Sequence, residues 1–175
     1  MQKALEAIVY LANKKPDMTQ YFFMKMMFYA DKFHLNEYGI PIIGDKYIKM
    51  EMGPVPSFVL NALHLDGERL THDMYERIDQ ALLFRKHYTK IFTTAKRPAN
   101  KILLSATNIN CLDRAFDFCK DKDIDKLKDL THKEPAWKEA EKNREMDYTL
   151  FIDKRNPNYK ALKADLSDDF GTLVL

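Results

Sequence analysis

The sequence lacks any segment that could cross a membrane. No stretch reaches the roughly 18 apolar residues that a transmembrane helix needs. The short apolar run near the N-terminus is broken by Glu6, which makes it a poor signal peptide. We therefore expect a cytoplasmic protein without membrane contact.

Cysteine is scarce, and the two copies are badly spaced for chemistry. Cys111 and Cys119 lie on one predicted helix, about 12 Å apart along its axis. A disulfide requires Cα atoms within roughly 7 Å of each other. The sequence also lacks a CxxC pair and a Cys/His cluster with the spacing of zinc ligands. We expect two buried reduced thiols, no metal and no cofactor.

The chain also lacks a strong net charge, an internal repeat, a linker and a low-complexity stretch. Its net charge of +2 favours no charged partner by itself. With 46% apolar and 31% charged residues the composition is that of a globular protein. A chain of 175 residues can build one core but is short for two. We expect one domain over residues 1–175, with a core to about residue 145 and a C-terminal extension over 146–175.

Helical spacing of apolar residues dominates what is present. It predicts a helix over residues 3–14 and a second from Thr19 to about Glu37. The second is apolar almost all round between Tyr21 and Ala30, which is typical of a buried helix. Gly39 can take the left-handed conformation that ends it. Further helices are expected over residues 56–65, from Ser105 or Thr107 to 120, over 124–130, and, after the capping-box pattern Thr131-x-x-Glu134, around Trp137.

Strand signals are shorter and weaker. Residues 42–52 alternate loosely, with Ile48, Met50 and Met52 on the expected inner face. The turn signal at Gly44 favours a hairpin over residues 41–51. Two more strands are expected over 81–85 and 90–94. The fold class is therefore mainly α (α+β): a compact helical domain around a buried central helix, with a small β-hairpin or short sheet.

One polar group invites a catalytic interpretation. Asp31 and His34 share a helix face, and Asp45 follows nearby, so the three could form an acid–base or metal group. No recognised catalytic motif surrounds them. The favoured interpretation is a polar network that orders residues 38–57, and a hydrolase remains an alternative.

A basic stretch raises a second alternative. Residues 81–112 contain no acidic side chain, and the basic ones are Arg85, Lys86, Lys90, Lys96, Arg97 and Lys101. Such a stretch could contact phosphates, but it is sparse and has no helix-turn-helix signature. A solvated basic face that suits an acidic protein partner is favoured over nucleic-acid binding.

Two phrases of the sequence carry a resemblance to a known family. The first joins Tyr29-Ala30-Asp31-Lys32-Phe33-His34-Leu35, Tyr38-Gly39, Ile43-Gly44-Asp45, Tyr47 and Gly53-Pro54-Val55-Pro56-Ser57. The second is Leu130-Thr131-His132 followed by Pro135-Ala136-Trp137. Together they resemble the Panacea, or SocA-like, antitoxin domain, which also occurs in phage-associated proteins. The resemblance spans about residues 5–142 and is weaker over 81–112 and after 147.

The resemblance implies a mainly helical domain without a catalytic residue set. It implies an antitoxin that neutralises a cognate toxin, usually encoded beside it, by direct binding. One branch of the family hands its toxin to a Clp-type protease, which is a second implied partner. The residues of the family signature are expected to be structural; they are Gly39, Gly44, Asp45, Gly53, Pro54, Pro56, His132 and Trp137.

The toxin interface is expected at the exposed end of the first phrase, because binding residues commonly lie on loops held by rigid elements. These candidates are Asp31, His34, Tyr47, Lys49 and Glu51. A second set lies in the basic stretch and comprises Arg85, Lys86, Lys96 and Arg97.

Overall fold

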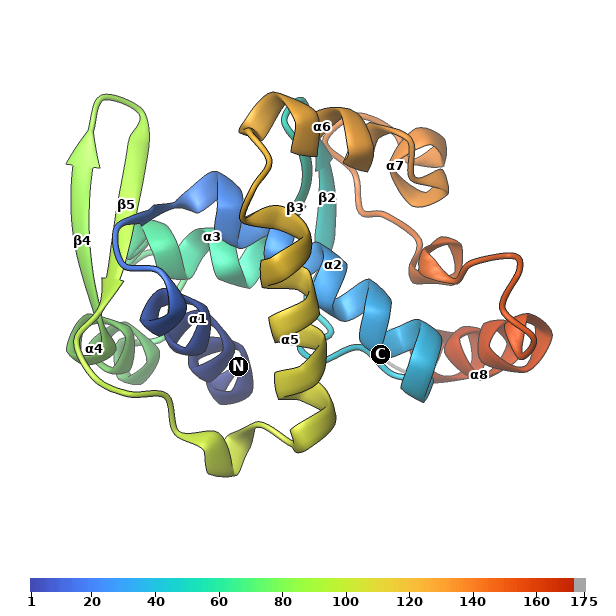
Figure 1. Ribbon diagram of the computed structural model, residues 1–175, viewed down its shortest axis with the longest axis horizontal. Coiled ribbons are helices and arrows are strands. Elements are labelled where there is room, and N and C mark those ends of the chain that lie inside the picture. The colour runs from blue at the N-terminus through green and yellow to red at the C-terminus, as the bar shows by residue number, and fades with distance from the viewer. Residues whose placement is uncertain (172–175) are drawn as a thin grey trace.

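A long buried helix, α2, runs through the middle of the protein (Figure 1). The computed structural model describes residues 1–171, with side chains to Leu166. The elements in chain order are α1 (Gln2–Lys14), β1 (Met18–Thr19), α2 (Gln20–Tyr38), β2 (Tyr47–Met50), β3 (Gly53–Pro56), α3 (Ser57–His64), α4 (His72–Ala81), β4 (Leu82–His87), β5 (Lys90–Ala95), η1 (Lys101–Leu103), α5 (Ala106–Cys119), α6 (Ile124–His132), α7 (Pro135–Glu139), η2 (Tyr148–Phe151) and α8 (Tyr159–Gly171). The predicted mainly α architecture is confirmed.

Helix α2 is buried because apolar side chains occupy nearly its whole circumference up to Ala30. Phe23, Met26 and Phe28 have no exposed surface. Helix α5 crosses it, and α3 and β3 pack along it (Figure 1). Gly39 ends the helix with φ of 82°, as its position predicts.

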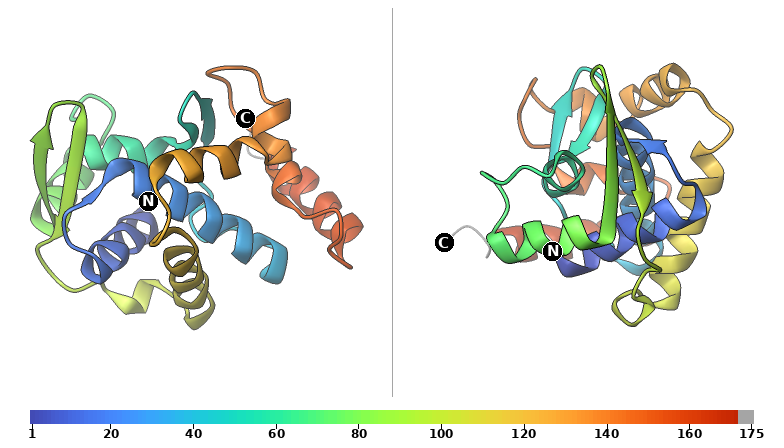
Figure 2. Two further views of the ribbon diagram at one scale, coloured as in Figure 1. Left: turned by 45° about the horizontal axis from the view of Figure 1, so that its top comes forward. Right: turned by 90° about the vertical axis from the view of Figure 1, so that its left-hand side faces the viewer.

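Two small antiparallel sheets flank the helices. The predicted strands in the basic stretch are confirmed as β4 and β5, which pair from Leu82↔Ala95 to His87↔Lys90. With the two-residue β1 they form a sheet in the order β1-β5-β4. This hairpin projects from the helical body (Figures 1 and 2). The second sheet is the hairpin β2–β3.

The expected hairpin over residues 41–51 is wrong. Its first half is a loop, because the backbone N–H groups of Ile42 and Ile43 bond to a side chain of α2 rather than to a strand. The expected faces of β2 are also wrong at Tyr47 and Met50. Tyr47 is 0% exposed, whereas Met50 is 39% exposed, since the hydroxyl of Tyr47 reaches a buried carboxylate in the core.

The expected capping box at Thr131 is also wrong. Thr131 lies inside α6, and its hydroxyl donates to the Lys128 carbonyl at 2.9 Å. Helix α7 starts with Pro135 and has no side-chain cap. By contrast, Ser105 caps α5 in a capping box with Asn108, and the two cysteines of α5 are free and buried, as predicted.

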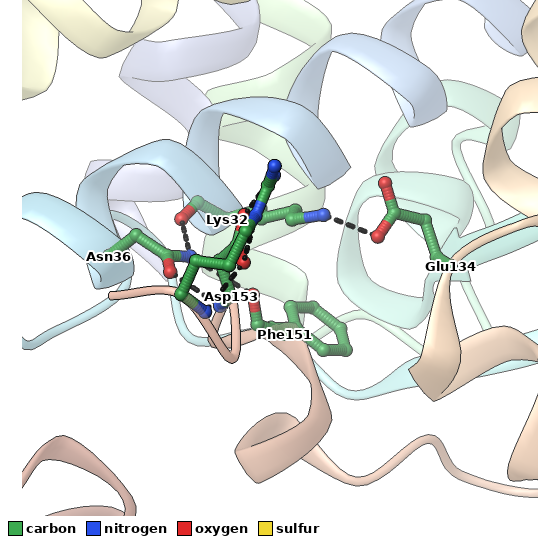
Figure 3. A network of polar contacts seen from close by, with 6 residues as sticks. Lys32, Asn36, Glu134, Phe151 and Asp153 are labelled. Atoms are coloured by element: carbon green, nitrogen blue, oxygen red, sulfur yellow. Dashed lines mark hydrogen bonds and ion pairs between the residues drawn. The ribbon is translucent and has the colours of Figure 1, made fainter. Parts of the chain in front are cut away.

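The segment after residue 145 packs against α2 rather than apart from it. Met146, Tyr148 and Phe151 are buried in the common core. Figure 3 shows Asn36 of α2 bonding to the Phe151 carbonyl at 2.9 Å and accepting from the Asp153 N–H at 2.7 Å. In the same view Lys32 pairs with Glu134, which joins α2 to the start of α7. The predicted domain end at residue 175 lies outside the described residues.

Within the described part of the chain, no helix is long and apolar enough to cross a membrane. Nor do His, Cys, Asp or Glu side chains gather there in a group of three or more that could hold a metal ion.

Candidate functional site: the β2–β3 hairpin and the groove beside it

Asp31 anchors the chain that leads into the hairpin. Its Oδ1 accepts from the N–H groups of Ile42 and Ile43 at 2.8 and 3.0 Å, and its Oδ2 accepts from the Tyr47 hydroxyl at 3.1 Å. Desolvation raises the pKa of this carboxyl to about 6, and outweighs the hydrogen bonds that lower it. Every strong partner of Asp31 is thus a local structural group.

Asp45 and His34 are engaged in the same way. Asp45 accepts from the N–H groups of Phe58 and Val59 at 3.0 and 3.1 Å, so it satisfies the free first turn of α3. His34 contacts the Ile40 carbonyl at 2.7 Å with one ring nitrogen and Asn108 at 2.9 Å with the other. These contacts fix α2, α3 and α5 against one another and leave no free acid–base pair.

A buried lysine supports the turn of the hairpin from below. Lys25 is 2% exposed and donates to the Met52 carbonyl. Gly53 has φ of 104°, and a Cβ there would lie 2.5 Å from the Thr131 hydroxyl and closer still to the Lys25 ammonium. Burial lowers the pKa of Lys25 to about 7 and raises that of the neighbouring Cys119 thiol to about 12, so the thiol supplies no negative charge. Gly53 is therefore required by both its backbone and its neighbours.

The second signature phrase holds the tip of the same hairpin. The Trp137 indole N–H donates to the Met50 carbonyl at 3.2 Å. The Trp137 ring stacks on His132 with centroids 3.7 Å apart, and the Lys49 ammonium lies 4.3 Å from its centroid. Lys49 also donates to the Ala140 carbonyl at 2.8 Å. Two segments far apart in the sequence, residues 29–57 and 130–137, therefore build one clamp on the hairpin.

A groove opens between the hairpin tip and the start of α2. Its volume is about 280 Å³. Three methionines give it a mainly apolar wall: Met24 from α2, Met50 from β2 and Met52 from the hairpin turn. Its rim is formed by Leu60 of α3 and by Thr89 of the turn between β4 and β5. Methionine is flexible and polarizable, so such a wall can adapt to an apolar side chain of a partner. Glu51 stands exposed at the tip.

The structure separates the expected interface residues into two groups. The expectation that Asp31, His34 and Tyr47 lie at the surface is wrong, because each is at least 97% buried by the network described above. Glu51 is exposed and Lys49 is half-buried beside it. Of the five residues expected at the hairpin, Lys49 and Glu51 remain available to a partner, and their role there stays a prediction.

The basic stretch is less basic in three dimensions than in sequence. Arg85 pairs with Asp17 at 2.5 Å, Arg97 forms a bidentate pair with Glu6, and Lys96 lies 3.8 Å from Asp79. Acidic partners from α1, the loop after it and α4 thus neutralise Arg85, Lys96 and Arg97, which are half of the basic side chains of the stretch. Lys86 has no such partner among the described residues.

Comparison with known proteins agrees with this architecture. Residues 23–138 match the family model described as "Antitoxin SocA-like, Panacea domain". The chain belongs to this family. The match covers most of α2, both hairpins and α6, so most of the residues that build the site lie inside the matched region. No curated protein and no solved structure matches the chain significantly.

The geometry gives the Panacea signature a physical meaning in this chain. Asp31 and Asp45 hold the loop before the hairpin, Gly53 admits Lys25, and Trp137 clamps the tip. Sequence reasoning missed Lys25 and the groove. A cation inside the apolar stretch 21–30 was the available signal, since a lysine is rarely buried without a structural or functional reason.

Proposed function

We propose that this protein is a cytoplasmic antitoxin that neutralises a protein toxin by direct binding. Membership of the SocA-like Panacea family supports an antitoxin role. The observation that carries the proposal further is the methionine-lined groove beside a hairpin tip that is clamped from two sides. A rigid frame with an adaptable apolar wall suits recognition of a protein surface.

The toxin-binding surface proposed is the hairpin tip with the groove. Met50 is an exposed apolar side chain there, and Glu51 and Lys49 add charge of both signs at its edge. A surface with an apolar centre and a polar rim is typical of protein interfaces. Asp31, His34 and Tyr47 contribute by holding this surface in place.

A catalytic role has less support. The acid–base hypothesis required free side chains of Asp31, His34 and Asp45, and their hydrogen bonds go to backbone groups and to neighbouring side chains that order the fold. A nucleic-acid role is likewise disfavoured, because Arg85 and Arg97 are paired with carboxylates.

The test is co-expression with the protein encoded by the adjacent gene. We expect that protein to arrest growth alone and to be harmless with the antitoxin present. Met50→Lys should abolish rescue, because it places a charge in the groove wall. Ile102→Lys is the matched control, since Ile102 is 93% exposed on η1 and is not among the residues that line the groove. A neighbour that is harmless alone, or toxic despite the antitoxin, contradicts the proposal.

The same co-expression experiment tests whether the protein delivers the toxin to a Clp-type protease. If the protein acts as an adaptor, rescue requires a Clp-type protease and the toxin level falls. If it acts by binding alone, rescue persists in cells without the protease, and the toxin accumulates in a complex.

A further inference from the structure

Strand β4 is the edge of its sheet and carries unused backbone hydrogen-bonding groups. The sheet order is β1-β5-β4, so β4 has a partner on one side only. The Lys96 N–H bonds to the Ala81 carbonyl at 2.8 Å. Hydrogen-bonded pairs alternate along an antiparallel ladder, so Leu83, Arg85 and His87 bond to β5. The backbone groups of Phe84 and Lys86 therefore point away from the sheet.

This edge contrasts with the corresponding edge of the other hairpin. Residues 143–146 cover β2, where the Lys49 N–H bonds to the Arg144 carbonyl at 3.0 Å and the Met146 N–H to the Tyr47 carbonyl at 2.7 Å. In Figure 1, β4 forms the outer side of the projecting hairpin. Natural proteins usually shield an edge with charged side chains, proline, a bulge or a covering segment. Strand β4 has the charges of Arg85 and Lys86, which deter a like-charged strand but not an acidic one. Six-residue β4 has no proline, pairs with β5 without a bulge and exposes 56% of Leu83.

The turn that joins β4 to β5 carries an exposed aromatic residue in an unfavourable backbone conformation. Tyr88 has φ of 53° and is 84% exposed. A positive φ is unusual for a bulky residue, and glycine or asparagine would fit such a turn with less strain. The Tyr88 ring meets the ring of the exposed His87 edge-on, with centroids 4.5 Å apart, but Tyr88 stays 84% exposed, so little burial offsets this cost. Strained residues of this kind cluster at functional sites, and tyrosine is enriched among the residues that dominate binding.

The positive charge around the turn between β4 and β5 favours an acidic partner. Lys86 and Lys90 flank Tyr88, are exposed and have no carboxylate partner among the described residues. Two copies of this positive edge repel each other, which disfavours pairing between copies of this chain. An acidic strand is attracted instead. The surface also adjoins the groove, because Thr89 of the same turn lies on the groove rim.

We infer that the free edge of β4, together with Tyr88, binds an extended acidic segment of the toxin by adding a strand to the β1-β5-β4 sheet. This inference rests on the proposed antitoxin function and names a second contact for it. The outward N–H and C=O groups of Phe84 and Lys86 form the new ladder. Tyr88 anchors the end of the added segment, and Lys86 and Lys90 pair with its carboxylates. Strand addition of this kind takes affinity from the main chain and specificity from alternate side chains.

Three substitutions test separately the backbone hydrogen bonds of β4, the charge of Lys86 and the ring of Tyr88. Lys86→Pro removes an outward N–H that β5 does not use, and an edge strand tolerates proline there. Lys86→Ala removes the charge alone. Tyr88→Gly removes the ring and relieves the backbone. Ile102→Ala is the control for loss of an exposed apolar side chain.

The measurement is the affinity of each purified variant for the purified toxin, with amide hydrogen exchange on the wild-type complex. We expect Tyr88→Gly to weaken binding by about thirtyfold at an unchanged or higher melting temperature. We expect Lys86→Pro to bind more weakly than Lys86→Ala, and Ile102→Ala to bind as the wild type does. The amides of Phe84 and Lys86 should become protected in the complex.

The outcomes distinguish the two proposals. If the wild type does not bind or neutralise the toxin, both are overturned. If the wild type neutralises the toxin, but the β4 and Tyr88 variants bind within threefold of it and exchange at Phe84 and Lys86 is unchanged, the strand-addition proposal alone is overturned.

Discussion

Asp31 offers the sharpest test of the structural interpretation, because one buried carboxylate orders the whole approach to the hairpin. In Asp31→Ala the N–H groups of Ile42 and Ile43 lose their acceptor. An unsatisfied buried donor costs about 1–3 kcal/mol, so the two together cost about 2–6 kcal/mol. That is a large part of the 5–15 kcal/mol that stabilises a typical domain, and we expect the variant to be poorly folded.

Asp31→Asn keeps an acceptor and removes the charge, which makes the pH dependence informative. The pKa of Asp31 is raised from 3.8 to about 6 in the folded state, chiefly by desolvation. The unfolded chain therefore loses this proton first as the pH rises, and the contribution of Asp31 to stability falls between pH 4 and 6. A shift of roughly two units corresponds to about 3 kcal/mol.

Urea unfolding at pH 4.5 and 7.5, followed by the fluorescence of the single tryptophan, measures both effects. We expect Asp31→Asn to gain stability relative to the wild type on going from pH 4.5 to 7.5, by about 2 kcal/mol, because about 1.5 pH units separate pH 4.5 from the folded-state pKa. The exposed carboxylate variant Asp117→Asn is the control and should show no such gain. The reasoning is refuted if Asp31→Ala lies within about 1 kcal/mol of the wild type, or if the Asn variant shows the same difference at both pH values.

Three further predictions concern the clamp around the hairpin. Gly53→Ala should cost at least about 2 kcal/mol, because a Cβ meets Thr131 and Lys25 at a left-handed φ; a melting temperature within 2 °C of the wild type, about the shift expected for less than 1 kcal/mol, would contradict this. Trp137→Phe removes the N–H bond to the Met50 carbonyl and should cost about 1 kcal/mol, and Trp137→Ala should cost more because the ring contacts are also lost; equal losses would count against the stacking. The pKa of Lys25 is lowered from 10.5 to about 7 by burial, so the unfolded state binds more protons above pH 7 and wild-type stability should rise from pH 7 to 10. Lys25→Met should flatten that rise in urea titrations, and a parallel rise in both proteins would show that the pKa of Lys25 is not lowered in the folded state.

Local patterns predicted most elements of the fold. The apolar circumference of residues 21–30 predicted the buried helix, and Gly39, Ser105 and the strands around His87 followed from local preferences. The hairpin register was mispredicted, because Gly44 is a turn signal but Asp31, from another element, claims the adjacent N–H groups. The alternation of apolar and polar residues along a strand does not show whether a distant side chain will take the backbone N–H groups that the strand would use.

The candidate site was only partly predictable for the same reason. Sequence proximity suggested that Asp31, His34 and Tyr47 form a surface, but burial against α5 and η2 placed them inside. Absence of acidic residues over 81–112 suggested a charged face, but Asp17, Glu6 and Asp79 from elsewhere in the chain neutralise much of it.

The sequence by itself determined the helical class, the central helix and the family, because periodicity and short motifs are properties of neighbouring residues. Only the tertiary structure decided what those motifs do. It turned two distant phrases into one clamp on the β2–β3 hairpin, buried Lys25 beneath its turn, opened the methionine groove beside it and left one edge of β4 bare. Each of these depends on which segments meet in space, and long-range packing and hydrogen bonding set that arrangement.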